Sequence, residues 1–215
     1  MDAAVSRRRT YQSGLRAEQA EQTRLRIRQA ARELFERQGF AETTIAEIAE
    51  TAGVAVPTVY AAFRSKGGVV GAMLEDLEEA ADQAGWEARI RAEPDPVRQL
   101  HLFVRWTRML FEAGAPVLRA AMHARGDPDV AALIEQGDAN RLSGTTELAE
   151  HWAQQQALRP GLQVEEAAHA LWLLTSVEQY LLATDRLGWS PETYERWLAS
   201  LAHRAIMGAG SDATP

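Results

Sequence analysis

The chain has 215 residues, no cysteine and a formal net charge of −7 at pH 7. This length allows one or two domains with a proper buried core. The absence of cysteine excludes a disulfide framework, a thiolate nucleophile and a thiolate metal site, and no apolar run approaches the roughly 18–20 residues of a membrane span. We therefore expect a cytoplasmic protein with no membrane partner.

The charge is distributed unevenly along the chain. Residues 1–70 hold 11 Lys or Arg and 8 Asp or Glu, whereas residues 71–215 hold 12 and 22. A mildly basic first third on an acidic remainder suits a protein that contacts phosphates at one end only.

Residues 1–20 are polar and contain Arg7-Arg8-Arg9, with no sustained apolar period. Two interpretations stay open for this stretch. It is either a disordered, solvated tail or a basic arm laid on DNA phosphates or in a minor groove.

A first helix is predicted from about Thr23 to Gln38, followed by Gly39 as the residue just past its C-terminus. Its apolar residues recur at helical spacing. They are Ile27, Ala30, Ala31, Leu34 and Phe35. Arg24, Arg28 and Arg32 occupy another face, where we expect solvated charges with one or two near phosphate.

Two short helices joined by a tight turn are predicted over residues 43–66. Thr44 and Glu47 have the spacing of a capping box, and Gly53 suits the turn. Pro57 is tolerated in the first turn of the second helix, on which Val59 and Phe63 share a face. This succession is typical of a helix-turn-helix, whose second helix enters a DNA major groove.

The remaining residues predict only helices, so the fold class is all-α with about nine helices. Ser65 can cap the next helix, which runs to about Ala92. Gly67-Gly68 is a poor opening turn for it, interpreted either as a hinge or as a frayed end. Asp127-Pro128 and Ser190-Pro191 each place a capping residue before proline. The later helices are expected over residues 97–112, 116–123, 128–156, 164–187 and 191–207.

The last two predicted helices carry too many apolar residues for one stripe, so each must be buried on two sides. A second copy of the chain is the simplest cover, because most symmetric assemblies are homodimers. We expect a homodimer formed through these two helices.

The first third of the chain resembles the TetR family of bacterial transcriptional repressors. The resemblance rests on Gly39-Phe40, Thr43-Thr44-Ile45, Ala52-Gly53-Val54, Thr58-Val59-Tyr60 and Ser65-Lys66. It implies four parts: residues 1–20 as a basic arm, 21–66 as the DNA-binding head, 67–208 as an effector-binding and dimerisation body, and 209–215 as a disordered tail. It also implies a repressor that binds a palindromic operator in double-stranded DNA as a homodimer and leaves it when a small molecule binds.

The resemblance further implies the DNA contacts. Thr44, Tyr60 and Lys66 are expected at phosphates, and Ala55, Val56, Pro57, Thr58 and Ala61 at base edges. Family members often carry a hydroxyl at the position of Ala55, a Gly or polar residue at Pro57, and a large aromatic or His at Ala61 or Ala62. Without an Arg or Asn fork, this helix is left with contacts to thymine methyl groups, and we expect specificity partly from DNA shape.

The family also binds a small, often hydrophobic or aromatic effector inside the body. Large side chains with one polar edge suit such a site. The candidate pocket residues are Trp106, Met109, Trp152, His169, Trp172 and Glu178, and plain core packing is the competing interpretation for each.

Two alternatives to a ligand-responsive regulator remain. An enzyme is disfavoured, because the sequence has no H-E-x-x-H, phosphate-binding glycine loop or G-x-S-x-G motif, so no catalytic residue, metal or cofactor is assigned. The other alternative is a TetR-like ligand-binding or interaction protein whose DNA site is weakened or lost.

Overall fold

The computed structural model describes residues 2–207, with side chains from residue 16 onward. Within that range every regular element is helical, which confirms the all-α prediction. The first four helices are α1 (Asp2–Glu42), α2 (Ile45–Thr51), α3 (Val56–Phe63) and α4 (Lys66–Ala80). The body continues with α5 (Gln83–Ala92), α6 (Pro96–His123), α7 (Pro128–Gln154), α8 (Val164–Leu174), α9 (Val177–Leu181), the π-helix η1 (Leu182–Arg186) and α10 (Pro191–Ile206).

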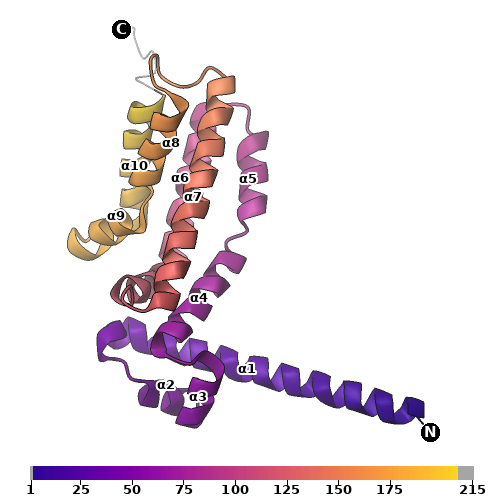
Figure 1. The fold of residues 1–215 in the computed structure, drawn as a ribbon. Coiled ribbons are helices and arrows are strands. Elements are labelled where there is room, and N and C mark those ends of the chain that lie inside the picture. The colour runs from indigo at the N-terminus through magenta and orange to yellow at the C-terminus, as the bar shows by residue number, and fades with distance from the viewer. Residues whose placement is uncertain (1, 208–215) are drawn as a thin grey trace.

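The helices form a small head and a longer upright body (Figure 1). α1 projects sideways from the head, and α2 and α3 lie beneath it, while α6 and α7 run the length of the body beside α8 and α10. Among the described residues, no helix has both the length and the apolar character needed to cross a membrane.

The first helix begins earlier than the sequence predicted. Residues 2–20 belong to α1, where a disordered arm was one of two interpretations. The stretch contains no proline, and Ala, Arg, Gln and Glu are all good helix formers, so it can extend the helix that starts the core stripe. Gly39 lies at φ 81°, as expected of the residue that ends the regular helix. The side chains of Arg7 to Arg9 and the tail 209–215 lie outside what the structure describes.

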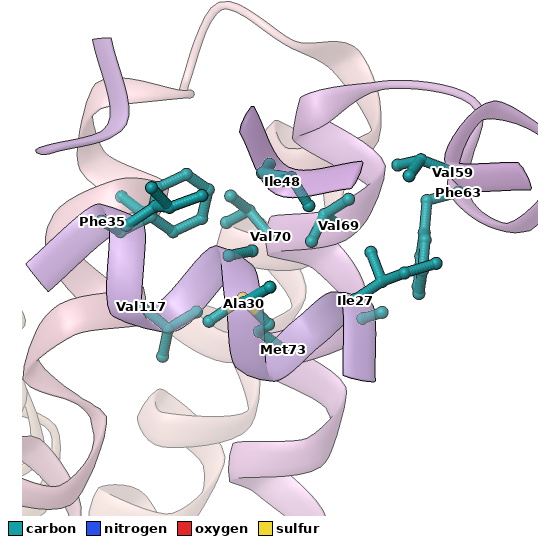
Figure 2. Close-up of a cluster of buried hydrophobic side chains, with 14 of the residues drawn as sticks. Ile27, Ala30, Phe35, Ile48, Val59, Phe63, Val69, Val70, Met73 and Val117 are labelled. Atoms are coloured by element: carbon teal, nitrogen blue, oxygen red, sulfur yellow. The ribbon is translucent and has the colours of Figure 1, made fainter. Parts of the chain in front are cut away.

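The core of the head is one cluster of buried apolar side chains (Figure 2). Ile27 and Phe35 of α1 meet Ile48 of α2, Phe63 of α3 and Val69 of α4 in this cluster. The cluster also includes Val117, Ala120 and Ala121 of α6 and Val130 of α7. The apolar core therefore continues from the head into the base of the body, across the boundary expected at residue 66.

The opening turn of α4 is tightly packed. Ser65 accepts a hydrogen bond from Gly68 N at 2.9 Å and so caps the helix as predicted. A Cβ at Gly67 would overlap the Asp127 carboxylate, and one at Gly68 would overlap the Phe63 carbonyl. The two glycines are thus explained by close approach of backbone and carboxylate.

Three predicted helix boundaries in the body are wrong. α6 continues through Pro116 where a break was expected. The expected helix to Ala92 divides at Asp82, whose backbone is left-handed (φ 45°, ψ 43°), a conformation that Asp tolerates better than most residues. The expected helix over 164–187 divides at Thr175 and Ser176.

The caps predicted before the prolines that begin α7 and α10 are present. Asp127 accepts from Asp129 N at 3.0 Å, and Ser190 accepts from Thr193 N at 3.2 Å. The body core that these helices enclose includes Trp152, Tyr194, Leu171 and Leu198, all fully buried.

Candidate nucleic-acid interface and ligand cavity

The turn into α2 has the predicted capping box. Glu47 N donates to Thr44 Oγ1 at 3.2 Å, and Thr44 N donates to the Glu47 carboxylate at 2.8 Å. The hydrogen bonds that Thr44 N and Thr44 Oγ1 each donate to the Glu47 carboxylate at 2.8 Å lower the pKa of Glu47. The N-terminus of α2 is therefore satisfied within the protein.

Helix α3 presents a mostly apolar outer face. Val59 and Phe63 are buried against the core, as predicted. The side chains of Ala55, Val56, Pro57, Tyr60 and Ala61 are exposed, and Thr58 is half-buried. Tyr60 is the most accessible large side chain of this face, 52% exposed. Ala55 is the N-cap residue and makes no side-chain hydrogen bond.

Lys66 is directed into the head rather than toward solvent. Its Nζ donates to Phe40 O at 2.6 Å and Thr43 O at 2.7 Å, with a longer bond to Ala41 O at 3.4 Å. The ammonium also lies 4.1 Å from the Phe40 ring centroid. Burial lowers its pKa, against the opposing charges of Glu42 and Glu47. An ammonium has three donors, so the expected phosphate contact would have to displace one of these carbonyls.

The arginines on α1 also make internal contacts, and of the three only Arg28, 11% exposed, departs from the expectation of solvated charges. Arg24 donates to Ala62 O at 2.5 Å. Arg28 is paired with Asp76 of α4 at 2.6 Å, and Arg32 donates to Ala113 O of α6 at 2.6 Å. Each guanidinium joins α1 to another helix.

Other exposed cations remain on the head. Among the described side chains, Arg26, Arg37 and Arg64 are exposed and have no carboxylate within 4.0 Å. Arg64 directly follows α3 and is its C-cap residue, at φ 64°. Arg64 was not among the predicted DNA contacts, although its position next to the helix-turn-helix is visible in the sequence.

A cavity of about 280 Å³ lies within the body. It is enclosed by residues of α4, α5, α6 and α7 and by the break between α8 and α9. Gln83, Trp86, Glu87, Ile90 and Arg91 line it from α5 alone, and this spacing places them on one helical face. The volume is close to the lower end of the roughly 300–1,000 Å³ typical of small-molecule sites.

Comparison with known proteins agrees with both parts of this architecture. Residues 27–73 match the family described as bacterial regulatory proteins, tetR family. The HTH-type transcriptional regulator TtgR of Pseudomonas putida is 39% identical over 80 residues, which are 37% of this chain and 38% of that regulator. By sequence, residues 27–73 of this chain, which form most of the head, are therefore similar to the DNA-binding region of TetR-family regulators.

The resemblance to solved TetR-family structures extends over almost the whole chain. NalD, the secondary repressor of the MexAB-OprM multidrug efflux pump in Pseudomonas aeruginosa, is 26% identical with a TM-score of 0.65, over 90% of this chain and 100% of that one. A TetR-family regulator from Syntrophomonas wolfei gives a TM-score of 0.69 at 16% identity, over 90% and 99%. The second likeness shows the fold alone.

Only some of the six residues expected at the pocket line the cavity. Trp106 and Glu178 line the cavity. Trp152 is fully buried and donates to Gln99 Oε1 at 2.7 Å, so it belongs to the core. Met109 is 41% exposed and His169 is exposed, and neither lines the cavity.

Trp172 lies one layer behind the cavity. Its ring stacks on Arg141, with the guanidinium carbon 4.7 Å from the ring centroid, and its Nε1 donates to Asp138 O at 3.1 Å. Arg141 and Asp138 are the cavity-lining residues of that contact. The sequence analysis missed Arg141 and Trp86, because which face of a helix meets a cavity depends on the packing of its neighbours.

Proposed function

We propose that this chain is a ligand-responsive repressor of the TetR family, which binds an inverted-repeat operator as a homodimer and leaves it when a small molecule enters the cavity. The observation that carries the proposal is the connection between the two sites. α4 starts directly behind α3, after Arg64 and Ser65, and its Leu74, Leu77 and Glu78 line the cavity.

For DNA contact, the proposal uses the exposed face of α3. Tyr60 would bind a phosphate through its hydroxyl, which fixes register without reading sequence. Thr44 would do so only after giving up the hydrogen bond that its Oγ1 donates to Glu47. Val56, Pro57 and Ala61 would contact thymine methyl groups, with Ala55 and Thr58 at the ends of that face. We add Arg64 as a phosphate contact and assign Lys66 the role of holding the turn between α1 and α2 in place.

Dimerisation is proposed through the C-terminal helices. Leu173 on α8, Leu182 and Leu187 in or beside η1, and Trp197 on α10 are between 36% and 60% exposed. Exposed apolar side chains gathered on neighbouring elements favour a second copy as their cover. Two heads held in this way would meet two half-sites about 34–36 Å apart.

The route from cavity to head runs through the connection between α6 and α7. Arg125 lines the cavity and is paired with Glu178 at 2.7 Å. Two residues later, Asp127 caps α7 and lies 3.4 Å from Ser65 Oγ, at the start of α4. A ligand that displaces the Arg125–Glu178 pair would therefore shift a short segment that contacts the base of the head.

The repressor role is supported by relatives. NalD is by its description a repressor of a multidrug efflux pump, and TtgR and ArpR are described as regulators of transcription. The curated relatives are matched over 38% of their length. They therefore support a role in transcription and say nothing about the effector of this chain.

The test is selection of bound sequences from a random DNA pool with the pure protein at moderate salt. We expect an enriched inverted repeat, with affinity that falls steeply as salt rises. Tyr60→Phe should weaken all enriched sequences alike, whereas Glu75→Gln, on an exposed site of α4, should not.

A folded dimer that enriches no sequence would contradict the proposal. It would favour the alternative of a ligand-binding protein with a lost DNA site, for which the uncapped N-terminus at Ala55 is the specific observation.

A further inference from the structure

The charges on the cavity wall are unequal. Three arginines and five carboxylates line it. Each arginine is already paired with one of those carboxylates. The pairs are Arg91–Glu147 at 2.8 Å, Arg125–Glu178 at 2.7 Å and Arg141–Asp138 at 2.9 Å. Each guanidinium is therefore partly neutralised, which weakens its attraction for an anionic ligand.

Two carboxylates on the wall are left without a cation. Among residues 16–207, Glu78 and Glu87 have no Lys, Arg or His nitrogen within 4.0 Å. Glu87 is half-buried, and its carboxylate accepts one hydrogen bond, from Gln83 Nε2 at 2.8 Å. Glu78 is exposed, and its carboxylate lies 3.8 Å from where a Cβ at Gly137 of α7 would stand. The two groups come from neighbouring helices, α4 and α5, and give the wall a net negative charge.

Two tryptophan rings line the same cavity, and the Arg89 guanidinium already lies over the Trp86 ring, 5.2 Å from its centroid. Trp86 precedes Glu87 on the cavity face of α5, and Trp106 lines the cavity from α6. The Trp106 indole is held in orientation, since its Nε1 donates to Ala81 O at 3.1 Å and its ring lies 6.3 Å from the Phe103 ring. Ring faces of tryptophan attract cations. Most other lining side chains are aliphatic, among them Leu74, Leu77, Ile90, Leu110, Leu133 and Ile134.

We propose that the effector is a lipophilic cation, an aromatic or aliphatic body that carries a quaternary or protonated amine. The cationic group is bound between the Glu78 and Glu87 carboxylates with an indole face beside it, and the apolar body fills the aliphatic part of the cavity. The inference rests on the proposed function only in taking this cavity as the effector site. It depends on uncompensated charge and ring faces together, since neither alone selects a charged ligand.

The experiment compares three probes that share one body and differ in charge: 4-phenylbutyltrimethylammonium, 4-phenylbutan-1-ol and 4-phenylbutanesulfonate. Their dissociation constants are measured by calorimetry on the full chain. We expect the cation to bind about tenfold more tightly than the alcohol, and the sulfonate to bind most weakly.

Variants then locate the charge selectivity. Glu78→Gln and Glu87→Gln should each weaken the cation about three- to tenfold and leave the alcohol unchanged. Glu79→Gln is the matched control, because Glu79 is an exposed carboxylate next to Glu78 that does not line the cavity. It should change neither probe. Thermal unfolding of each variant checks that the body is folded.

The inference is overturned if the cation does not bind, if the alcohol or sulfonate binds as tightly, or if both cavity variants keep the full preference for the cation. Release of DNA is measured separately with each probe. Cation binding that follows the predicted pattern without any effect on DNA supports the inference and contradicts the proposed function. DNA release by the alcohol or sulfonate alone supports the proposed function and overturns the inference.

Discussion

Helix breaks in the head and in the body are closed by different kinds of contact. In the head, the turn after α1 is closed by Lys66, whose ammonium bonds the carbonyls of Phe40 and Thr43, and by the capping box at Thr44. Both closures lie outside the cavity. The head therefore holds its shape by contacts that no ligand reaches.

In the body, two of the breaks are closed by residues of the cavity wall. Trp106 donates to Ala81 O at the break between α4 and α5. Arg141 donates to Trp172 O and, at 3.0 Å, to Thr175 O at the break between α8 and α9. Both Trp106 and Arg141 line the cavity. A ligand that moves either side chain acts directly on the backbone, so the body can change shape while the head moves as a unit.

The largest effect should follow removal of a body tryptophan that does not touch the cavity. Trp152→Ala should lower the free energy of unfolding by about 3–5 kcal/mol, as other buried aromatic truncations do, because Trp152 is fully buried and bonded to Gln99. Chemical denaturation monitored by circular dichroism measures this.

Trp106→Ala is the informative partner, since Trp106 is half-buried on the cavity wall. It should cost less stability than Trp152→Ala and weaken ligand binding more. The reverse order would place Trp152, rather than Trp106, at the effector site.

A smaller loss is expected at Lys66. Lys66→Met keeps the aliphatic stem but leaves the Phe40 and Thr43 carbonyls without their donor, which should cost about 1–3 kcal/mol of unfolding free energy. Arg64→Met is the control, because Arg64 is exposed and two residues away. It should leave stability nearly unchanged and weaken DNA binding. If Lys66→Met lost DNA affinity at unchanged stability, the phosphate role expected from the sequence would be restored.

Whether a contact could be predicted from the sequence depends on how far apart its two residues lie along the chain. The caps at Thr44, Ser65, Asp127 and Ser190 were all predicted and are all present, because each is a hydrogen bond to a backbone amide two or three residues along. Such patterns are written locally in the sequence.

The breaks and continuities of the body helices depend on distant partners. α6 continues through Pro116. In the turn before that proline, Ala113 O accepts a hydrogen bond from Arg32 of α1, which is 81 residues earlier in the chain. The division at Thr175 is favoured locally, since Thr175 Oγ1 donates to Leu171 O and Ser176 caps α9, and side-chain bonds of this kind compete with the helix. Its carbonyls, however, are satisfied by Arg141 on another helix. A single stretch of sequence carries no signal for that partner.

The cavity was predicted only in part for the same reason. Trp106, Trp152 and Trp172 are equivalent as sequence features, since each is a large ring on an amphipathic helix. Packing makes the first a cavity wall, the second core and the third a support for Arg141. Composition indicates a body rich in aromatic residues without indicating which of them meet empty space.

The break at Thr175 provides a test of the ligand-sensitive closure. Arg141→Met removes two carbonyl contacts and the ion pair with Asp138, and should cost about 1–2 kcal/mol, because the site is partly exposed. It should also change ligand affinity several-fold, which Lys66→Met should not. Calorimetry with the phenylbutyl probes measures the difference. Equal ligand affinities in wild type and Arg141→Met would remove the distinction between the two kinds of closure.

The smallest expected effect is the pH dependence of the capping box. Hydrogen bonds from Thr44 hold the pKa of Glu47 below 4.5. Because the pKa is lower in the folded than in the unfolded chain, the stabilisation is fully present above about pH 4.5, and it is lost as the pH falls through the lowered pKa. The difference in unfolding free energy between wild type and Glu47→Gln should therefore be constant near neutral pH and shrink in acid.

The comparison with Glu47→Gln separates charge from hydrogen bonding, because a glutamine oxygen can still accept from Thr44 N. Glu50→Gln, an exposed change on the same helix, controls for the general acid sensitivity of the protein and should follow wild type throughout. A Glu47→Gln difference that did not shrink in acid would mean that the cap acts through shape alone. Since α2 supports the base of α3, weakened DNA binding in acid by wild type but not by Glu47→Gln would connect this cap to the recognition surface.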